Sequence, residues 1–428
     1  MFKNDMRFGL CAVLMAAGVS ANAETVAVSA ARLIDVQSGK VIEHPVVVIE
    51  DERITAVGPA ASVTVPAGAK HIDLPNLTLL PGLIDMHVHL TGEATIGGYN
   101  SLLYTDSFWP IVGVKNAKKT VEAGFTSVRN VGSEHFDDVG LRQAIDEHII
   151  SGPRITTATY ALSATGGHCD QTYFPPSMNQ TSPAVGDSPD ELRQKVRWVH
   201  KYGATVIKVC VSGGVFDHGA SVGAQQLNLE EIKAITDEAH MEGLRVAAHA
   251  HGTASIADAI RGGIDTIEHA SLIDDEGIKL AKEKGAYLSM DIYNTDYTQA
   301  EGKKNGELEE NLRKDREIGE AQRENFKKAV KAGVKMIFGT DAGVYPHGDN
   351  AKQFAVMVRY GMTPLQAIQA ATITAAKALD QEKNVGQIQI GKFGDIIGVA
   401  GDPLTDVTVL EHVAFVMKGG DVVKNEAK

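Results

Sequence analysis

Helical segments that end at glycine alternate with apolar stretches through most of this chain. Six times, a segment with helical spacing stops at a glycine, and a short apolar stretch then leads into a polar residue. Glycine commonly follows the last turn of a helix because that position favours a positive φ. The repeated order of helix, glycine and strand predicts an α/β protein with parallel strands. The glycines are Gly124, Gly203, Gly243, Gly263, Gly285 and Gly333.

Polar residues end these apolar stretches, and they are Asn130, Lys208, His249, His269, Asp291 and Asp341. Two more strands are expected, one ending at His89 and one over residues 154–160, which makes eight. Eight such units predict a closed (β/α)8 barrel of the TIM type, with its active site at the C-terminal ends of the strands. Core packing does not require a lysine, several histidines and an aspartate at those ends, so we expect them to converge on one site.

Both ends of the chain show another pattern, in which short β-rich stretches lie between glycines. Residues 24–78 include the apolar stretches Val26–Val28 and Val46–Ile49. Residues 383–428 include a strand predicted over Gly386–Lys392 and a hairpin turn at Gly419–Gly420. We therefore expect one small β-sandwich domain built from both chain ends, with the barrel occupying residues 79–382 between them.

Three insertions follow strand ends, where a barrel places its substrate-binding loops. Residues 91–110 are rich in glycine and aromatic residues, and residues 170–190 carry Tyr173 and Phe174 before two prolines. Both insertions are candidates to line a pocket for an apolar or aromatic group, and ordinary loop packing is the alternative. Residues 295–315 are polar and charged, which predicts a solvated surface element.

The first residues read as a secretory signal peptide. Lys3 and Arg7 precede an apolar stretch, and Ala21-Asn22-Ala23 is a cleavage signature, so residues 1–23 are expected to be removed after Ala23. This predicts a secreted or periplasmic protein. No later segment is a long enough apolar run to cross a membrane. The net charge of −13 argues against nucleic acid or an anionic membrane as a partner.

Two cysteines remain beyond the predicted signal peptide, Cys169 and Cys210. This number excludes a small disulfide-rich scaffold. An exported chain permits one bridge between them, because both are expected near strand C-termini. Two free or buried thiols are the favoured interpretation.

The candidate site residues are His87, His89, Lys208, His249, His269 and Asp341. His87 and His89 are two residues apart on an expected strand, so their side chains share one face. Imidazoles and a carboxylate suit zinc or a similar divalent ion. A lysine ammonium has no lone pair to donate to a metal. Lys208 therefore either forms an unrelated ion pair or is converted by CO₂ to a carbamate, whose two oxygens can bridge two metals.

Several segments together resemble the amidohydrolase superfamily, over essentially the whole chain beyond residue 23. The sequence is most similar to secreted prolidase-like carboxypeptidases with a bridging carboxylated lysine, and close to enzymes that hydrolyse the amide of ochratoxin A. The matching segments are Pro81–His89, Val206–Val209, His249–Gly252, Glu268–Ala270, Gly339–Gly343, Gly391–Ile396 and Asp402–Leu404.

The resemblance implies a role for each candidate. His87, His89 and Asp341 would hold one divalent ion, His249 and His269 would hold a second, and carboxylated Lys208 would bridge the two, with zinc as the expected metal. Asp341 would also orient the attacking water, accept its proton and pass it to the leaving nitrogen.

Two more histidines are candidates for substrate contact. His251 lies two residues after His249, and the resemblance suggests that it contacts the substrate carbonyl or the developing oxyanion. A competing interpretation makes His251 the ligand in place of His249. His168 follows Gly166–Gly167 and could bind a substrate carboxylate, or it could be an ordinary loop histidine.

Further side chains complete the expectations for the pocket. Tyr293, together with Asp291, is a candidate for the pocket wall, whereas His218 and His347 are expected in surface loops. Relatives of this kind often assemble as multimers, so a homo-oligomer is expected.

The resemblance implies a binuclear-metal amidohydrolase that releases a C-terminal amino acid from an N-acyl amino acid or an Xaa-Pro dipeptide. Hydrolysis of ochratoxin A to ochratoxin α and phenylalanine is the specific expectation. The alternative is a cyclic amide or lactone hydrolase of the imidazolonepropionase type, which generally uses one metal and needs no bridging lysine, and Lys208 favours two metals. A non-catalytic binding protein is disfavoured because all six candidate positions are filled.

Overall fold

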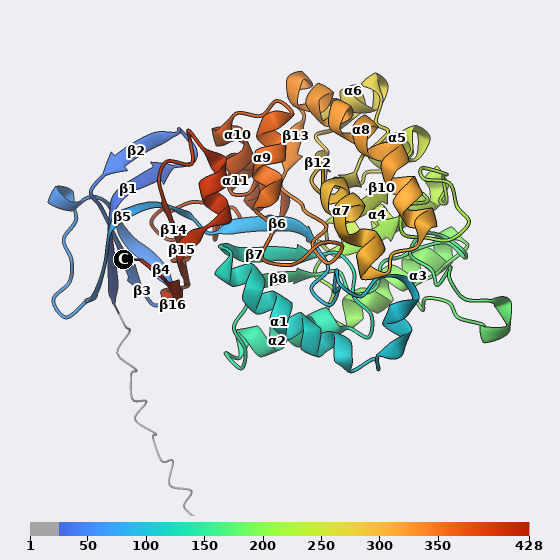
Figure 1. Ribbon diagram of the computed structural model, residues 1–428, viewed down its shortest axis with the longest axis horizontal. Coiled ribbons are helices and arrows are strands. Elements are labelled where there is room, and N and C mark those ends of the chain that lie inside the picture. The colour runs from blue at the N-terminus through green and yellow to red at the C-terminus, as the bar shows by residue number, and fades with distance from the viewer. Residues whose placement is uncertain (1–24, 428) are drawn as a thin grey trace, which may run out of the picture.

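The computed structural model describes residues 25–427 of the chain, as a β-domain at one end of a larger barrel (Figure 1). The predicted signal peptide, residues 1–23, lies outside the described residues. Within residues 25–427, no helix combines the length and apolar character that a membrane crossing needs.

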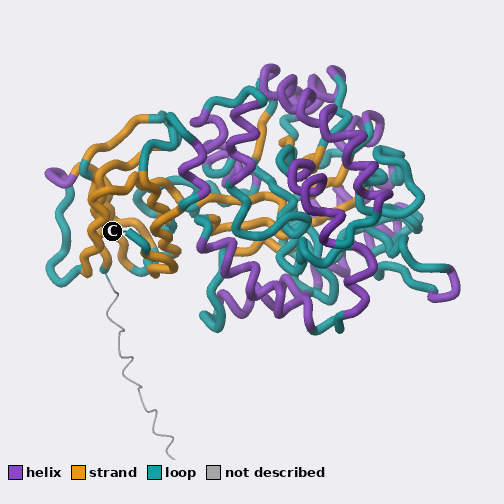
Figure 2. Tube along the Cα trace, viewed as in Figure 1, coloured by secondary structure: helices purple, strands orange, loops and turns teal. Residues whose placement is uncertain are grey.

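The β-domain combines strands from both ends of the chain in one sheet, which Figure 2 shows as a separate group of orange strands. Its hydrogen-bonded order is β16-β15-β14-β5-β1-β3-β4, with β2 paired to β1. The strands are β1 (Val26–Asp35), β2 (Lys40–Glu43), β3 (Pro45–Glu50), β4 (Arg53–Pro59), β5 (Lys70–Pro81), β14 (Ile396–Ala400), β15 (Val413–Lys418) and β16 (Asp421–Asn425).

Eight parallel strands form the barrel. β6, β7 and β8 pair in one run and β9 to β13 in another, and parallel bridges at Leu162–Val209 and Val88–Ala342 join the two runs into a closed ring. The predicted fold, a (β/α)8 barrel with a β-domain made from both ends, is therefore confirmed. The strands are β6 (Leu83–Val88), β7 (Phe125–Asn130), β8 (Arg154–Thr157), β9 (Ile207–Cys210), β10 (Val246–Ala250), β11 (Thr266–His269), β12 (Tyr287–Ser289) and β13 (Lys335–Ile337).

Helices cover the outside of the barrel (Figures 1 and 2). The six glycines that follow predicted helices all have positive φ, between 72° and 111°, as the sequence pattern requires. The capping box predicted at Asn228 is also present at the start of α4. The helices are α1 (Phe108–Glu122), α2 (Asp137–Asp146), α3 (Pro189–Lys201), α4 (Leu229–Met241), α5 (Thr253–Arg261), α6 (Asp275–Lys284), α7 (Asn294–Asn305), α8 (Glu309–Ala332), α9 (Lys352–Arg359), α10 (Pro364–Ala370) and α11 (Ile373–Ala378).

Some predicted element limits were wrong. Gly386–Lys392 contains no strand, because Gly386 and Gly391 both take positive φ and the segment turns where a strand would extend. The strand expected over residues 154–160 ends at Thr157. Lys208 lies within β9, and Asp341 follows β13 after a short connection, so neither is the last residue of its strand.

Candidate metal centre and active site

A cavity of about 950 Å³ opens at the C-terminal ends of the barrel strands. The helices α7 and α8 and the segments that follow β6 and β8 contribute to its walls. The predicted ligands all line it, and they are His87, His89, Lys208, His249, His269 and Asp341. His168 and His251 line it as well. The structure thus brings these eight side chains to one cavity.

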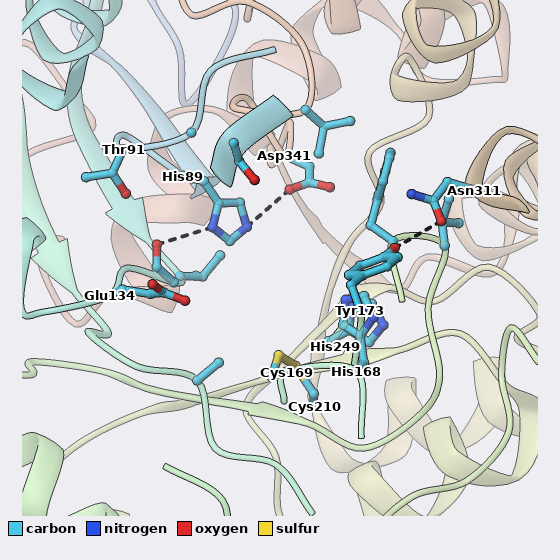
Figure 3. A pocket seen from close by; sticks show the side chains of 18 of the residues that line it. His89, Thr91, Glu134, His168, Cys169, Tyr173, Cys210, His249, Asn311 and Asp341 are labelled. Atoms are coloured by element: carbon cyan, nitrogen blue, oxygen red, sulfur yellow. Dashed lines mark hydrogen bonds and ion pairs between the residues drawn. A yellow bond between two sulfur atoms is a disulfide. The ribbon is translucent and has the colours of Figure 1, made fainter. Parts of the chain in front are cut away.

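Two histidines of β6 face the aspartate that follows β13. Asp341 Oδ1 lies 3.4 Å from His87 Nε2 and 3.2 Å from His89 Nε2, and Figure 3 shows the second contact. His87 Nδ1 donates to Glu268 Oε2 at 3.0 Å, and His89 Nδ1 donates to the carbonyl of Gly132 at 3.3 Å. Donation from Nδ1 leaves each Nε2 lone pair directed at the cavity, which is the arrangement of metal-ligating histidines.

A second group consists of His249, His251 and His269, whose ligand atoms lie within 4.8 Å of one another. His269 Nδ1 donates to Asp291 Oδ1 at 2.9 Å, and His251 Nδ1 lies 2.8 Å from Ser271 Oγ. The buried Nε2 of His249 has no hydrogen-bond partner among the described residues. Burial lowers the pKa of His249 and His251 well below the ordinary value, so both rings are neutral and can offer a lone pair.

Lys208 is 3% exposed, and its ammonium has no hydrogen bond or ion pair to any residue from 25 to 427. Burial lowers the pKa of Lys208 to about 8, against the opposing attraction of the Glu268 and Asp341 carboxylates. A buried ammonium without a partner is costly, because it loses hydration and gains no hydrogen bond in return. The position therefore suits a side chain that is modified or that faces another bound group.

A buried ion pair between Arg129 and Glu268 supports the ring of His87. Arg129 Nη2 lies 2.6 Å from Glu268 Oε1, and the same guanidinium donates to the Met86 carbonyl at 2.6 Å and to Thr266 Oγ1 at 2.8 Å. Burial alone would raise the pKa of Glu268, but Arg129 and then His87 bring it well below its ordinary value. Glu268 is therefore ionised and fixes the orientation of the His87 ring.

Asp291 and Asp341 are joined through helices α7 and α8. Asn294 Nδ2 donates to Asp291 Oδ2 at 3.1 Å and to Asp341 Oδ2 at 3.2 Å. Gln322 Nε2, from α8, donates to Asp291 Oδ1 at 2.9 Å. These amides hold the carboxylates in place without neutralising them, because an amide donates hydrogen bonds but carries no charge.

Three non-glycine residues at the site have left-handed backbone. The φ angles are 66° at His269, 48° at Ala270 and 60° at Asp341. Such angles cost free energy for residues with a side chain, and they cluster at sites where a side chain must point in one direction. Two of the six candidate ligands therefore owe their direction to strained backbone.

His168 stacks on His249, with ring centroids 3.9 Å apart and planes 15° from parallel. His168 Nδ1 donates to Asp217 Oδ2 at 2.9 Å, and the buried Lys314 ammonium of α8 lies 2.7 Å from Asp217 Oδ1. A Cβ on Gly214 would come within 2.5 Å of His168 and 2.7 Å of His249, so only glycine fits there. The His168 ring is therefore held over the floor of the cavity.

The three insertions all reach the cavity. Residues 91–110 contribute Tyr99, Tyr104 and Trp109, and residues 170–190 contribute Tyr173 and Phe174, which favours the pocket interpretation over ordinary loop packing. The prediction of a solvated surface element over residues 295–315 was wrong. The wall of the cavity includes Thr295 from α7, Glu307 and Leu308 from the connection between the helices, and Asn311 and Asp315 from α8. α7 and α8 pack against each other and direct these side chains inward, which composition alone cannot indicate.

Two residues lie elsewhere than expected. Tyr293 is not among the residues that line the cavity; its ring packs edge-on against Tyr345, with centroids 5.0 Å apart. His347 is buried where a surface position was expected, because its ring bridges Thr120 Oγ1 at 2.9 Å and the His89 carbonyl at 3.1 Å. His218 is exposed, as expected.

The favoured interpretation of the cysteines as free thiols was also wrong. A disulfide joins Cys169 to Cys210, whose Cα atoms are 5.9 Å apart (Figure 3). The loop after β8 folds back over β9, and this path brings the two residues together. Both cysteines line the cavity.

Sequence reasoning missed the residues that support the ligands. Glu268 and Asp85 lie in segments that resemble the family, one and two residues before His269 and His87, but the sequence pattern predicts no role for either. Asp85 accepts from the His87 and Thr340 amides and from Thr340 Oγ1. Arg129 lies in β7, which is buried along its whole length, and a buried arginine requires a partner for its charge.

The chain belongs to the amidohydrolase family, whose model matches residues 78–423. A similar relative is an ochratoxinase from Aspergillus niger, which is 33% identical over 417 residues that cover 90% of this chain and 84% of the relative.

Solved structures agree with this assignment. A Xaa-Pro dipeptidase with methionine bound in its active site is 35% identical, with a TM-score of 0.88, over 93% of this chain and 99% of that one. The Aspergillus niger ochratoxinase structure is 30% identical, with a TM-score of 0.83, over 94% of this chain and 96% of that one. The protein is accordingly a hydrolase of the amidohydrolase family.

Proposed function

We propose that this protein is a binuclear-metal amidohydrolase that cleaves the amide bond to a C-terminal amino acid. The observation that carries the proposal is the buried Lys208 ammonium, which has no partner among the described residues and lies in a cavity lined by imidazoles and carboxylates. The buried Nε2 of His249, which also has no hydrogen-bond partner among the described residues, is a polar atom that a metal would satisfy.

The donor set fits two divalent cations, with zinc as the expected metal. His87, His89 and Asp341 would hold one cation, His249 and His269 would hold the other, and Lys208 as a carbamate would bridge them. Two such cations, when bound, supply the Lewis acidity that makes water nucleophilic near neutral pH and polarises the scissile carbonyl.

The chain's own groups move the proton and position the substrate. Asp341 accepts a proton from the attacking water and passes it to the leaving nitrogen, while Asn294 holds its second oxygen at 3.2 Å. His251 stabilises the charge that develops on the carbonyl oxygen. His168 binds the carboxylate of the leaving amino acid, because among the residues that line the cavity Lys208 is the only lysine and none is an arginine. Its Nδ1 proton is donated to Asp217, so Nε2 must carry a second proton to donate to a carboxylate. Burial lowers the pKa of His168, whereas the Asp217 carboxylate favours the doubly protonated ring.

Ochratoxin A is the specific substrate that we propose. It is an N-acyl phenylalanine, and the cavity offers aromatic surface at Tyr99, Tyr104, Trp109 and Tyr173 to both of its ring systems. The similarity to an ochratoxinase and to a Xaa-Pro dipeptidase supports an amide next to a C-terminal carboxylate.

The test is hydrolysis by the purified, zinc-loaded protein of ochratoxin A, N-acetylphenylalanine and Xaa-Pro dipeptides, with and without a chelator. The expected result is release of phenylalanine from ochratoxin A, detected by mass spectrometry, with loss of activity in the chelator and recovery with zinc. Absence of phenylalanine from a fully loaded enzyme would reject the substrate. One metal per chain would instead favour a cyclic amide or lactone hydrolase.

We also propose that the protein is exported after cleavage behind Ala23 and that it assembles as a homo-oligomer. The Cys169–Cys210 disulfide supports an oxidising compartment. N-terminal sequencing of the secreted form should begin at Glu24, and light scattering should give a multiple of the chain mass. An uncleaved N-terminus would contradict the proposed export, and a monomeric mass would contradict the proposed oligomer.

A further inference from the structure

The disulfide lies in the wall of the cavity, beside the candidate site. Cys210 follows Lys208 by two residues on β9, so both side chains lie on the same face of that strand, and both line the cavity. Cys169 is the neighbour of His168 on the segment after β8. Figure 3 shows the two sulfur atoms beside the His168 and His249 rings.

Apart from the disulfide, the segment that carries His168 is held by short-range backbone hydrogen bonds, by the stacking of His168 on His249 and by side-chain hydrogen bonds. Thr165 and Gly166 are exposed, and Gly166 has a φ of 68°. The His168 N–H donates to Gln226 Oε1 at 2.9 Å, and the His168 ring bonds to Asp217. Among the described residues, the disulfide is the only covalent link between this segment and a barrel strand.

We propose that the Cys169–Cys210 disulfide is a positioning element of the subsite that binds the substrate carboxylate. It ties the His168 segment to the same strand that carries Lys208, and so fixes the distance from the carboxylate-binding ring to the metal centre. The inference rests on the proposed function, in which His168 binds the leaving amino acid. Cleaving the bond leaves the six candidate ligands on their own elements, so substrate affinity falls while metal content stays unchanged.

The bond can be opened in the folded enzyme. Cys169 is half-buried at the cavity surface, so a small reductant can reach its sulfur, whereas Cys210 is fully buried. A water-soluble phosphine attacks one sulfur, the S–S bond breaks, and water supplies the oxygen of the phosphine oxide and the protons of the two thiols. A phosphine is preferable to a dithiol reductant, which would compete for zinc.

The decisive variant is Cys169→Ser with Cys210→Ser, assayed with zinc-loaded protein on N-acetylphenylalanine and on its carboxamide. We expect KM for the carboxylate substrate to rise about tenfold, which corresponds to the loss of one charge-assisted hydrogen bond, with kcat and zinc content unchanged. KM for the carboxamide should stay the same. Adding His168→Ala should cause no further loss, because the disulfide acts through His168.

The matched control is Thr181→Val, which removes the hydrogen bond from Thr181 Oγ1 to Asp170 in the same insertion but keeps the disulfide. It should leave KM within twofold of the unmodified enzyme. Phosphine-treated wild type should behave like the serine variant and recover on reoxidation, which keeps the test valid if the variant folds poorly.

Hydrogen exchange provides a readout that does not need activity. Opening the disulfide should speed amide exchange over residues 165–171 and leave β9 and β10 unchanged. Three results would each overturn the inference. They are unchanged amide exchange over residues 165–171, faster exchange throughout the barrel, and an equal rise in KM for both substrates. If unmodified enzyme hydrolyses neither substrate, the proposed function fails, and the exchange data still decide this inference.

Discussion

The floor of the cavity and its rim are built on different principles. The floor consists of the side chains at the strand ends, His87, His89, Lys208, His249, His269 and Asp341, and buried partners orient most of them. The rim consists of the three insertions, residues 91–110, 170–190 and 295–315, and exposes aromatic and acidic side chains. Leu102 in the rim is 55% exposed, whereas Lys208 in the floor is 3% exposed.

This difference separates chemistry from selectivity. Four floor residues, His87, His89, His269 and Asp341, are held by side-chain hydrogen bonds, and Lys208 and His249 face the same cavity without one, so a substitution in the floor should remove activity on every substrate. We expect each rim residue to contact only one part of a substrate, so changes there should shift KM for some substrates and leave kcat largely intact.

Asp341→Asn should produce the largest loss. The amide keeps the shape of the side chain but cannot accept a proton, so kcat should fall by about 10²–10⁴-fold. Steady-state kinetics on N-acetylphenylalanine would measure the loss. The control Asp349→Asn, at a half-exposed position paired with Lys352, should keep wild-type kcat. A kcat for Asp341→Asn within tenfold of wild type would exclude the proton-transfer role.

Lys208→Ala tests whether this lysine belongs to the metal centre. Activity should fall more than about a hundredfold and zinc content should drop, because the bridging anion is lost. A short carboxylate added to the assay should restore part of the activity by replacing the missing carbamate. The exposed Lys331→Ala is the control and should change neither quantity. Full zinc content in Lys208→Ala would remove Lys208 from the ligand set.

Most of the floor residues could be predicted from the sequence, but few of the buried residues that orient them could. Parallel strands deliver their C-terminal residues to one end of a barrel, so an apolar stretch that ends in His or Asp is enough to place that side chain. The Arg129–Glu268 pair joins residues 139 apart, and only the closed barrel brings them together.

The rim was harder to predict, because side-chain direction beyond a strand end has no fixed period. Immediately before the third insertion, Asp291 and Asn294 line the cavity, but Tyr293 between them turns toward Tyr345. The disulfide depends in the same way on the path of a loop. Local sequence therefore predicted which insertions carry aromatic residues, but not which of their side chains face the substrate.

Glu268→Gln tests the support beneath the floor. The neutral amide cannot balance Arg129 or hold His87 as strongly, so zinc affinity should fall by about 10–100-fold. Competition with a chromophoric chelator would measure the affinity. Glu276→Gln, on the exposed face of α6, should be neutral because its ion pair with Arg261 is solvent-exposed. Unchanged zinc affinity in Glu268→Gln would show that the floor does not depend on this pair.

Tyr173→Ala tests the rim. The Tyr173 hydroxyl donates to Asn311 Oδ1 at 3.0 Å, which holds its ring over the cavity (Figure 3). Loss of one aromatic contact should raise KM for ochratoxin A by about 2- to 10-fold, with kcat and zinc content unchanged. Tyr173→Phe, which keeps the ring, should lie between wild type and Tyr173→Ala. A fall in kcat comparable to that of Asp341→Asn would break the separation of floor and rim.

Asp138→Asn should have no effect on activity and a small effect on stability that depends on pH. Asp138 lies behind the floor and accepts from the Thr159 amide at 3.0 Å and from Asn130 Nδ2 at 3.3 Å. Burial raises the pKa of Asp138 from 3.8 to about 6, despite these hydrogen bonds. Between pH 3.8 and about pH 6, Asp138 keeps its proton in the folded protein but has lost it in the unfolded chain. The contribution of Asp138 to the free energy of unfolding therefore falls as the pH rises through this range.

The asparagine variant cannot ionise and should escape this loss. Relative to wild type, its free energy of unfolding should increase by about 1 kcal/mol between pH 5 and pH 7, as measured by denaturant titration at saturating zinc. Asp146→Asn, at the exposed end of the same helix, should show no such trend. If the difference in free energy of unfolding stays constant across this pH range, Asp138 is ionised throughout it. If kcat changes, Asp138 is coupled to the floor residues and belongs with them.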